Sequence, residues 1–489
     1  MANYVSLGQY NATLKIPEFK GLLQYGDGVN GDPRYSTDAV NMETYGGVLQ
    51  PCAACTPMTP ELDQPIETLA RLHRRWYVGD ESRDILIAAS GGKLYSALPT
   101  DTEWVEIGSG YQRNVWSWVT YEINPEGSEA PVDVLLLSNA LDGMVMVRGD
   151  DLSVSAVETP KKFGVIERYA ERIWGAAIDD DPDMLVYSAP YDPTNWSVNT
   201  EIPSDGAGDV MQPSWDGDSF TALRSFGSQL IAFKKQRVWR ILGTDPGEYV
   251  FKEQFGGGAP YASTIAVDAE RILMLGKDGV VQYDGLTVGP FQQEIVRDVY
   301  RRMNVSALEQ ATACLWRNEY LCALPIDGST INNAVLIYNM VDGTWLLRND
   351  VKVESFLPTD DALYFTSSTT PGKLWRWGEN SWETGAAAAA TCKWVSPWTD
   401  LGRRDIGKSG FEVYLLCEAA EPVALKISME TEKKIKTKEY RVQPAAGNHE
   451  QKKLRFGGNG RRFRLIIEST GGVWRMLGGV LILMETDPD

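Results

Sequence analysis

The chain has 489 residues, of which 43% are hydrophobic and 23% charged, so it has the composition of a globular protein and can bury a sizeable core. Its formal net charge of −19 argues against a protein that grips nucleic acid, because phosphate binding needs clustered lysine and arginine. No stretch approaches the roughly 18 apolar residues of a membrane span, and the first twenty residues lack the pattern of a secretion signal. Six cysteines are too few for a disulfide framework, so we expect a soluble protein made in a reducing cytoplasm.

The first 59 residues precede any regular pattern, and we predict an N-terminal arm at 1–59 that is a candidate for closing the domain that follows it. From about residue 83 one local pattern recurs, in which an apolar run, a turn rich in Gly, Asp, Asn or Pro, and a short alternating strand follow each other. Seven such units lie at 85–98, 132–149, 172–189, 228–243, 271–285, 334–348 and 362–378.

The second strands of these units are about 47 residues apart on average. Propeller blades repeat every 40–50 residues or so and contain four strands each. Some strands, such as 135–137 and 231–233, are apolar on both faces, as expected where sheets stack on one another. We therefore predict an all-β chain with a β-propeller of about seven blades at 60–385. A large β-sandwich or β-solenoid built from the same hairpins is the alternative.

One segment inside the predicted propeller breaks the strand pattern. Residues 290–303 place apolar side chains at helical spacing. Ser306 and Glu309 then form a capping box for a second short helix. We predict a helical insertion near 290–312, on a rim of the propeller.

The last part of the chain differs in charge. The alanine run 386–390 is typical of a linker. Residues 391–489 carry a formal charge of +4, against −23 for the rest of the chain, and 433–442 would form a basic, exposed strand. Further strands that alternate apolar and polar residues are expected at 411–418, 423–430, 452–457, 461–469 and 474–485. A β-sandwich at 391–489 is predicted, because short strands of this kind need a second sheet to cover their apolar face.

Four motifs could carry chemistry. Residues 402–409 match the phosphate-loop pattern, but a strand follows them in place of the helix that would hold the phosphates. Cys52 and Cys55 have zinc or redox spacing, yet they supply only two ligands. The acidic run 179–183 could gather calcium, although a solvated turn explains it equally simply. His73 is the one plausible general base in the propeller region, but its flanking arginines would depress its pKa and are not the carboxylate that a triad needs.

Tryptophan occurs about once per blade, and these residues could stack on sugars or pack between blades. They are Trp174, Trp196, Trp215, Trp239, Trp345, Trp375 and Trp377. We predict packing between blades. Paired carboxylates for glycosidic cleavage stay open, because nothing in the sequence selects a pair. We accordingly predict no catalytic residue, no metal ion, no cofactor and no enzymatic activity.

Residues 279–346 contain a strand pair, a helix that ends in a basic and aromatic stretch, and a strand with the phrase Val-Leu-Ile-Tyr-Asn followed by a tryptophan. Together with 41–58, 91–96 and 457–485, this region resembles the tail-hub or nozzle proteins of short-tailed phages, also described as packaged-DNA stabilisation proteins. The resemblance is scattered over about half of the chain. The alanine linker and the basic strand depart from it.

The resemblance implies a structural protein of the virion, assembled in the cytoplasm of the bacterial host. It implies a homo-oligomer, a hexameric ring below the portal and adaptor proteins, in contact with other tail proteins or fibres. Such a ring continues the DNA channel, retains packaged DNA and passes it during ejection without binding it specifically. One alternative is a tail-tip module that recognises a host surface glycan or protein, and another is a polysaccharide hydrolase.

Overall fold

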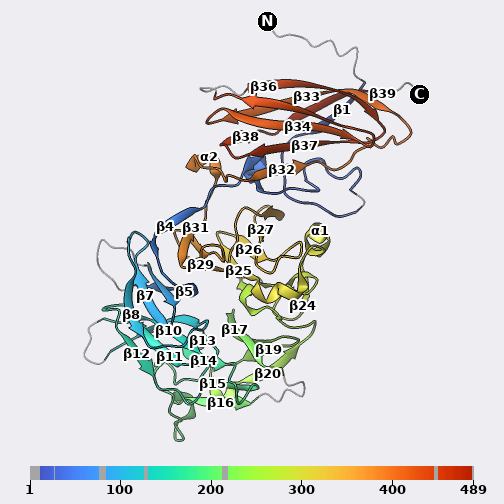
Figure 1. Cartoon of the computed structure of the whole chain (residues 1–489). Helices are drawn as coiled ribbons and strands as arrows, with labels where there is room; N and C mark the ends of the chain where they lie inside the picture. Colours follow the sequence, from blue (N-terminus) through green and yellow to red (C-terminus); the bar gives the residue numbers. More distant parts are fainter. Residues whose placement is uncertain are drawn as a thin grey trace.

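The computed structural model describes residues 11–26, 28–75, 84–125, 130–211, 218–444 and 450–486. Figure 1 shows a β-propeller with a β-sandwich beside it, and the sandwich lies near the blades that contain β27 and β31. The prediction of an all-β chain, with a propeller followed by a C-terminal sandwich, is confirmed. Within the described ranges the two α-helices, α1 (Arg297–Tyr300) and α2 (Ser381–Thr384), have about one turn each.

Seven antiparallel sheets of four strands follow one another through the described part of the propeller and form its blades. First strands of neighbouring blades contact each other, as β5 does with β9 and β29 with β5, so the first strands surround the axis. Blade one consists of β5 (Ile66–His73), β6 (Asp84–Ser90), β7 (Lys93–Ala97) and β8 (Val105–Ser109). Blade two consists of β9 (Ser117–Ile123), β10 (Val132–Asn139), β11 (Gly143–Arg148) and β12 (Val154–Val157). Blade three consists of β13 (Val165–Tyr169), β14 (Arg172–Ala176), β15 (Met184–Tyr187) and β16 (Gly208–Met211). Blade four consists of β17 (Phe220–Phe226), β18 (Gln229–Lys234), β19 (Val238–Leu242) and β20 (Val250–Gln254). Blade five consists of β21 (Ala266–Val267), β22 (Ile272–Gly276), β23 (Gly279–Tyr283) and β24 (Val288–Pro290). Blade six consists of β25 (Thr312–Trp316), β26 (Glu319–Leu324), β27 (Ala334–Asn339) and β28 (Thr344–Arg348).

The seventh blade takes its strands from two distant parts of the chain. β29 (Ser355–Pro358), β30 (Leu363–Thr366) and β31 (Lys373–Arg376) are consecutive, and the outermost strand is β4 (Thr56–Glu61) of the N-terminal arm. β4 runs antiparallel to β31, with Lys373 opposite Glu61. The ring is therefore closed by backbone hydrogen bonds between the start and the end of the propeller sequence.

The sandwich is also built from both ends of the chain. One sheet has the order β1-β39-β33-β36, with β38 paired to β33, and the other has the order β32-β37-β34-β35. The strands are β1 (Ala12–Ile16), β32 (Thr391–Val395), β33 (Lys408–Ala419), β34 (Val423–Thr431), β35 (Ile435–Val442), β36 (Glu450–Gly460), β37 (Phe463–Thr470), β38 (Trp474–Met476) and β39 (Val480–Thr486). The arm thus belongs to two domains, β1 to the sandwich and β4 to the propeller.

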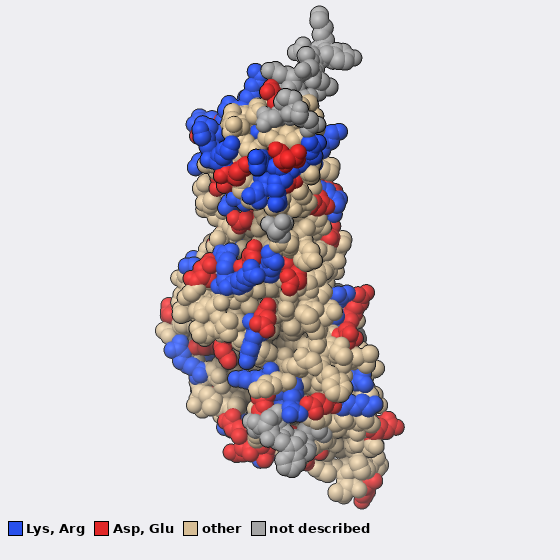
Figure 2. Space-filling model, turned by 90° about the vertical axis from the view of Figure 1, so that its right-hand side faces the viewer, with Lys and Arg blue, Asp and Glu red and all other residues tan. Residues whose placement is uncertain are grey.

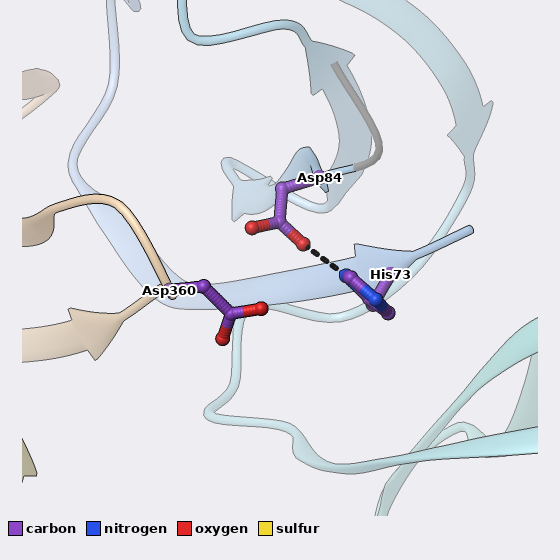
Figure 3. Close-up of side chains that lie close together, drawn as sticks. All are labelled: His73, Asp84 and Asp360. Atoms are coloured by element: carbon purple, nitrogen blue, oxygen red, sulfur yellow. Dashed lines mark hydrogen bonds and ion pairs between the residues drawn. The ribbon is translucent and has the colours of Figure 1, made fainter. Parts of the chain in front are cut away.

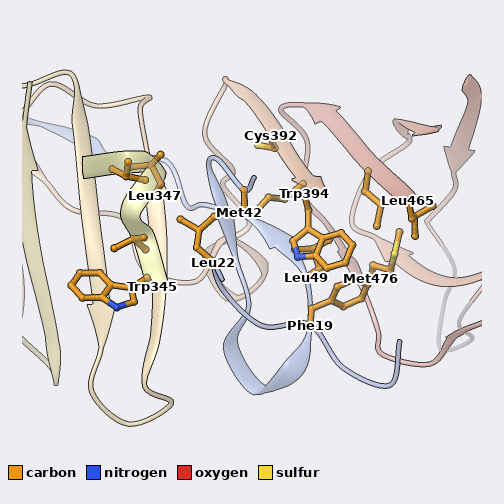
Figure 4. Packing of buried hydrophobic residues seen from close by; sticks show 14 of the residues in the cluster. Phe19, Leu22, Met42, Leu49, Trp345, Leu347, Cys392, Trp394, Leu465 and Met476 are labelled. Atoms are coloured by element: carbon orange, nitrogen blue, oxygen red, sulfur yellow. The ribbon is translucent and has the colours of Figure 1, made fainter. Parts of the chain in front are cut away.

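A single apolar core runs from blades five and six, through the arm, into the sandwich. Figure 4 shows this junction, where Leu22 and Met42 of the arm lie between Trp345 of blade six and Trp394 of the sandwich. Phe19 meets the Trp394 ring edge-on, with 5.1 Å between the ring centroids. Each such buried side chain contributes roughly 1.5–3 kcal/mol of transfer free energy, so the shared core holds the two domains in one arrangement. The short strands β2 (Met42–Glu43) and β3 (Gln50–Pro51) lie within this junction.

The helical insertion is shorter than the predicted span. It consists of η6 (Gln293–Val296), α1 and η7 (Val305–Gln310), and the predicted capping box does not form, because the Ser306 hydroxyl donates to the Asn304 side chain (2.7 Å). The insertion is held by the arm: the Gln24 N–H donates to the Ile295 carbonyl at 2.7 Å.

The alanine segment 386–390 is likewise hydrogen-bonded and is not a free tether. The Ala54 N–H donates to the Ala386 carbonyl (3.1 Å), and the Ala388 N–H donates to the Cys52 carbonyl (2.8 Å). Small side chains let these two backbones approach each other closely.

Candidate functional site

A cluster of titratable side chains lies where the first and last blades meet. His73 at the end of β5 and Asp84 at the start of β6 are opposite each other in the strand register. The His73 Nδ1 atom lies 2.7 Å from Asp84 Oδ1. Asp360, in the turn between β29 and β30, approaches the same place, and one ligand atom from each of the three residues falls within 4.8 Å of the others (Figure 3). We call this group the closure cluster.

Arg71 supplies the positive charge that faces the carboxylates of the closure cluster. Its Nη1 atom donates to Asp360 Oδ1 at 3.0 Å and lies 3.6 Å from Asp84 Oδ2. The hydrogen bond from Arg71 lowers the pKa of Asp360. Asp84 is nearly buried, whereas 72% of the Asp360 side chain is exposed. The ion pair therefore links blade one to blade seven beside the axis.

One nitrogen and two carboxylate oxygens form a donor set that zinc or manganese accepts. In the described structure the Arg71 guanidinium already supplies positive charge to both carboxylates. The arrangement thus fits ion pairs that hold the first and last blades together better than it fits a metal site. In the sequence the neighbours of His73 are arginines, whereas in the fold strand pairing brings the Asp84 carboxylate into contact with the imidazole.

A second charged pair lies on the inner strands. Glu167 of β13 and Arg224 of β17 approach within 3.9 Å. Burial raises the pKa of Glu167 to about 7, against the opposing effect of Arg224. A carboxyl with this pKa can gain or lose a proton near neutral pH. Besides Arg224, the backbone N–H groups of Arg168 and Ser225 partly offset the effect of burial on Glu167.

The loop with the phosphate-loop pattern has a structural task. Strand β33 begins at Lys408, so no helix N-terminus faces the loop. The Lys408 ammonium is buried and donates to the carbonyls of Arg403, Ile406 (3.0 Å) and Arg461 (2.9 Å). This lysine gathers loop carbonyls and is not placed to bind a nucleotide.

Two of the four aspartates in the acidic run 179–183 are paired with lysines. Lys161 pairs with Asp181 at 2.6 Å, and the buried Lys234 pairs with Asp183. These two ion pairs engage half of the carboxylates that a calcium ion would need.

The thiols of Cys52 and Cys55 lie at the domain junction. Burial raises the pKa of both, which disfavours the thiolate that redox or zinc chemistry requires.

The tryptophans of the propeller mostly pack within the core. Trp174 lies 5.0 Å from the ring of Tyr187 in the same blade and 5.0 Å from that of Tyr249, next to blade four. Trp345 is fully buried and Trp377 nearly so. Trp215 lies outside the described residues.

Sequence reasoning missed a buried polar group at the junction of arm, blade six and sandwich. The Glu43 carboxylate accepts hydrogen bonds from the Gln50 side chain (3.2 Å) and from the Ala53 N–H (3.3 Å). Beside it, the Tyr45 hydroxyl donates to Glu319 at 2.9 Å. Burial raises the pKa of Glu43 to about 7 and also raises that of Glu319. No spacing in the sequence signals this group, because its members come from separate strands.

No family model matches the chain, and no curated protein matches its sequence. Among solved structures, the crystal structure of BamB from Moraxella catarrhalis matches 76% of this chain and 99% of its own, with 9% identity and a TM-score of 0.36. The crystal structure of BBS1N in complex with ARL6DN matches 68% of this chain and 97% of its own, with 11% identity and a TM-score of 0.40. At this level the likeness concerns general architecture and has no bearing on function.

The helices of the described residues are too short and polar to cross a membrane.

Proposed function

We propose that the protein is a structural component of the virion of a short-tailed phage. In this role it forms a ring in the tail that continues the DNA channel below the portal and adaptor, retains packaged DNA and passes it during ejection. The role is structural and not enzymatic. The observation that carries the proposal is the resemblance of residues 279–346 to the tail-hub or nozzle proteins.

The position of residues 279–346 supports the proposal. They run from β23 into β28, include the helical insertion, and contribute to the apolar core that is shared with the arm and the sandwich. The Leu22 N–H donates to the Trp345 carbonyl at 2.7 Å, and the Asp298 N–H donates to the Gln24 side chain at 3.1 Å. The stretch of sequence that carries the resemblance therefore belongs to a segment that takes part in joining the domains. A tail component that transmits force between its neighbours benefits from such a shared core.

The charge of the chain also suits this role. A net charge of −19 makes the protein as a whole repel DNA phosphates. A repelling wall lets DNA slide, whereas clustered lysines would hold it and would make ejection sensitive to salt.

The test is to locate and count the protein in purified particles. Immunogold electron microscopy with an antibody against this chain, and quantitative mass spectrometry, should give six copies in a ring on the tail axis. An antibody against the major capsid protein is the control for labelling. Particles assembled without the protein should lose packaged DNA. Label on peripheral fibres, or absence of the protein from the particles, would overturn the proposal and favour host recognition or polysaccharide hydrolysis.

A further inference from the structure

The sandwich carries a concentration of positive charge that the rest of the chain lacks. Residues 423–464 contain 12 lysines and arginines against 4 acidic residues. Strand β35 is the edge of one sheet and β36 the edge of the other, and the two edges contact each other. Figure 2 shows blue side chains gathered over the sandwich at the upper part of the molecule.

Three lysines lie on these two edge strands, and we call them the lysine seam: Lys436 and Lys438 on β35, and Lys452 on β36. The Lys438 ammonium lies 5.8 Å from the centre of the Phe456 ring, and the Lys452 ammonium lies 5.2 Å from that of Tyr440. Lys438 and Lys452 thus lie over aromatic rings of the sandwich core, and Lys436 and Lys438 are exposed to solvent. Among the described carboxylates, none lies within ion-pair distance of these three lysines.

Blades two to five, which include the pole opposite the sandwich, carry an excess of acidic residues. Residues 117–290 contain 27 acidic residues against 13 lysines and arginines. At the end of the propeller away from the sandwich lie β16 and β20, the outermost strands of blades three and four (Figure 1), and η3 (Pro203–Asp205) contacts η4 (Pro246–Glu248) there. We call the exposed carboxylates of this region the acidic end: Glu201, Asp205, Asp209, Asp245 and Glu248.

Apolar side chains accompany the acidic end. Ile202, Met211 and Val250 are each about half exposed, at 51%, 50% and 46%. Among the described residues, no lysine or arginine forms an ion pair with the carboxylates of the acidic end. Exposed apolar groups beside unpaired charges are characteristic of a surface that binds another protein.

We propose that the lysine seam of one copy binds the acidic end of a second copy. Lysine on an edge strand commonly serves only to prevent strand pairing between molecules. Here, however, the lysines come from two edge strands that contact each other, and the same chain presents unpaired carboxylates with exposed apolar side chains at its other pole. Because the two surfaces differ, the contact is head-to-tail, and its repetition gives a ring if the rotation closes and a filament if it does not. The closed form rests on the proposed tail function; the contact itself does not.

The experiment is sedimentation velocity on the purified full chain over a range of concentrations, in 50 mM and 500 mM salt. We expect the wild-type chain to associate at low salt and to associate less at high salt, because exposed charges are screened. The variant K436E/K438E/K452E should associate at least about tenfold more weakly. Adding E201K/D205K/E248K to it should restore association, because the two surfaces then exchange their charges. The control K15E/K277E/K352E reverses three exposed lysines elsewhere and should associate like the wild type.

Three outcomes would overturn the inference. The first is a wild-type chain that stays monomeric at the lowest salt and highest concentration. The second is association that the lysine-seam variant leaves unchanged. The third is binding of a duplex DNA oligonucleotide that this variant abolishes, in a chain that does not self-associate, which would assign the lysine seam to nucleic acid.

Zero-length carboxyl-to-amine cross-linking of virions separates this inference from the proposed function. Six copies in a ring without cross-links between 430–455 and 201–253 would leave the tail function standing and refute the contact. Cross-links in the purified chain, together with its absence from virions, would do the reverse.

Discussion

Replacing Glu43 by glutamine should change how the stability of the protein depends on pH. Burial raises the pKa of Glu43 from 4.5 to about 7 in the folded protein, and the neighbouring Glu319 adds to the rise while Arg348 opposes it. Because the folded-state pKa is above the unfolded one, the folded protein binds a proton more tightly than the unfolded chain. The resulting stability is fully present below pH 4.5 and is lost as the pH rises through about 7.

The size of the effect follows from the same two pKa values. A difference of 2.5 units corresponds to about 3 kcal/mol over the full range, of which about 2 kcal/mol falls between pH 5.5 and 8.5. Glutamine cannot ionise, but it loses part of the hydrogen bonding to Gln50 and Ala53, which costs about 1 kcal/mol at any pH. The wild type should therefore exceed the variant in free energy of unfolding by about 2 kcal/mol more at pH 5.5 than at pH 8.5.

Urea unfolding at pH 5.5, 6.5, 7.5 and 8.5 measures this difference. Glu421→Gln, at an exposed position, is the control and should run parallel to the wild type. Because Glu319 is coupled to Glu43, the transition belongs to the pair and will be broader than for a single group. Parallel pH profiles for the wild type and Glu43→Gln would refute the assignment of the buried proton to this residue.

Three further substitutions test the junctions between domains. Gly21→Ala would place a Cβ atom 2.2 Å from the Trp345 carbonyl oxygen, so it should cost about 1–3 kcal/mol or more and speed proteolysis within the arm. Arg348→Met removes a bidentate partner of the nearly buried Asp350 and should cost about 3–5 kcal/mol in urea unfolding. Ile16→Ala truncates a fully buried side chain of β1 and should cost about 2–5 kcal/mol by the same assay.

Each of these substitutions has a matched control. Gly289→Ala adds a Cβ atom where nothing lies within 4 Å, so proteolysis of the arm should not change. The double variant R348M/D350L should recover much of the loss, because no charge is then left buried alone. Lys15→Ala, on the exposed side of β1, should be nearly neutral. If the controls lost as much stability as the test variants, the losses would reflect strand propensity and not contacts at the junctions between domains.

Local patterns were sufficient to predict the blades, but not the long-range joins. Strands such as 135–137 are apolar on both faces because blades stack on each other, and this leaves a visible mark in the sequence. The pairing of β1 with β39 leaves no such mark in the sequence. The five residues of β1 alternate in an ordinary way, and their partner strand lies about 470 residues away. The closure cluster escaped prediction for the same reason, since Asp84 and Asp360 reach His73 through strand pairing and ring closure.

The two long-range strand pairs also affect how the protein is made. At roughly 5–20 residues per second, β1 waits on the order of 20 to 100 s for β39 to be synthesised. β4 waits for β31, about 310 residues later, so the propeller ring also closes late. During this time both short strands and their unfilled positions are open to other chains and to chaperones. A chain that stops before residue 480 lacks the partner of β1 and cannot complete this sheet of the sandwich.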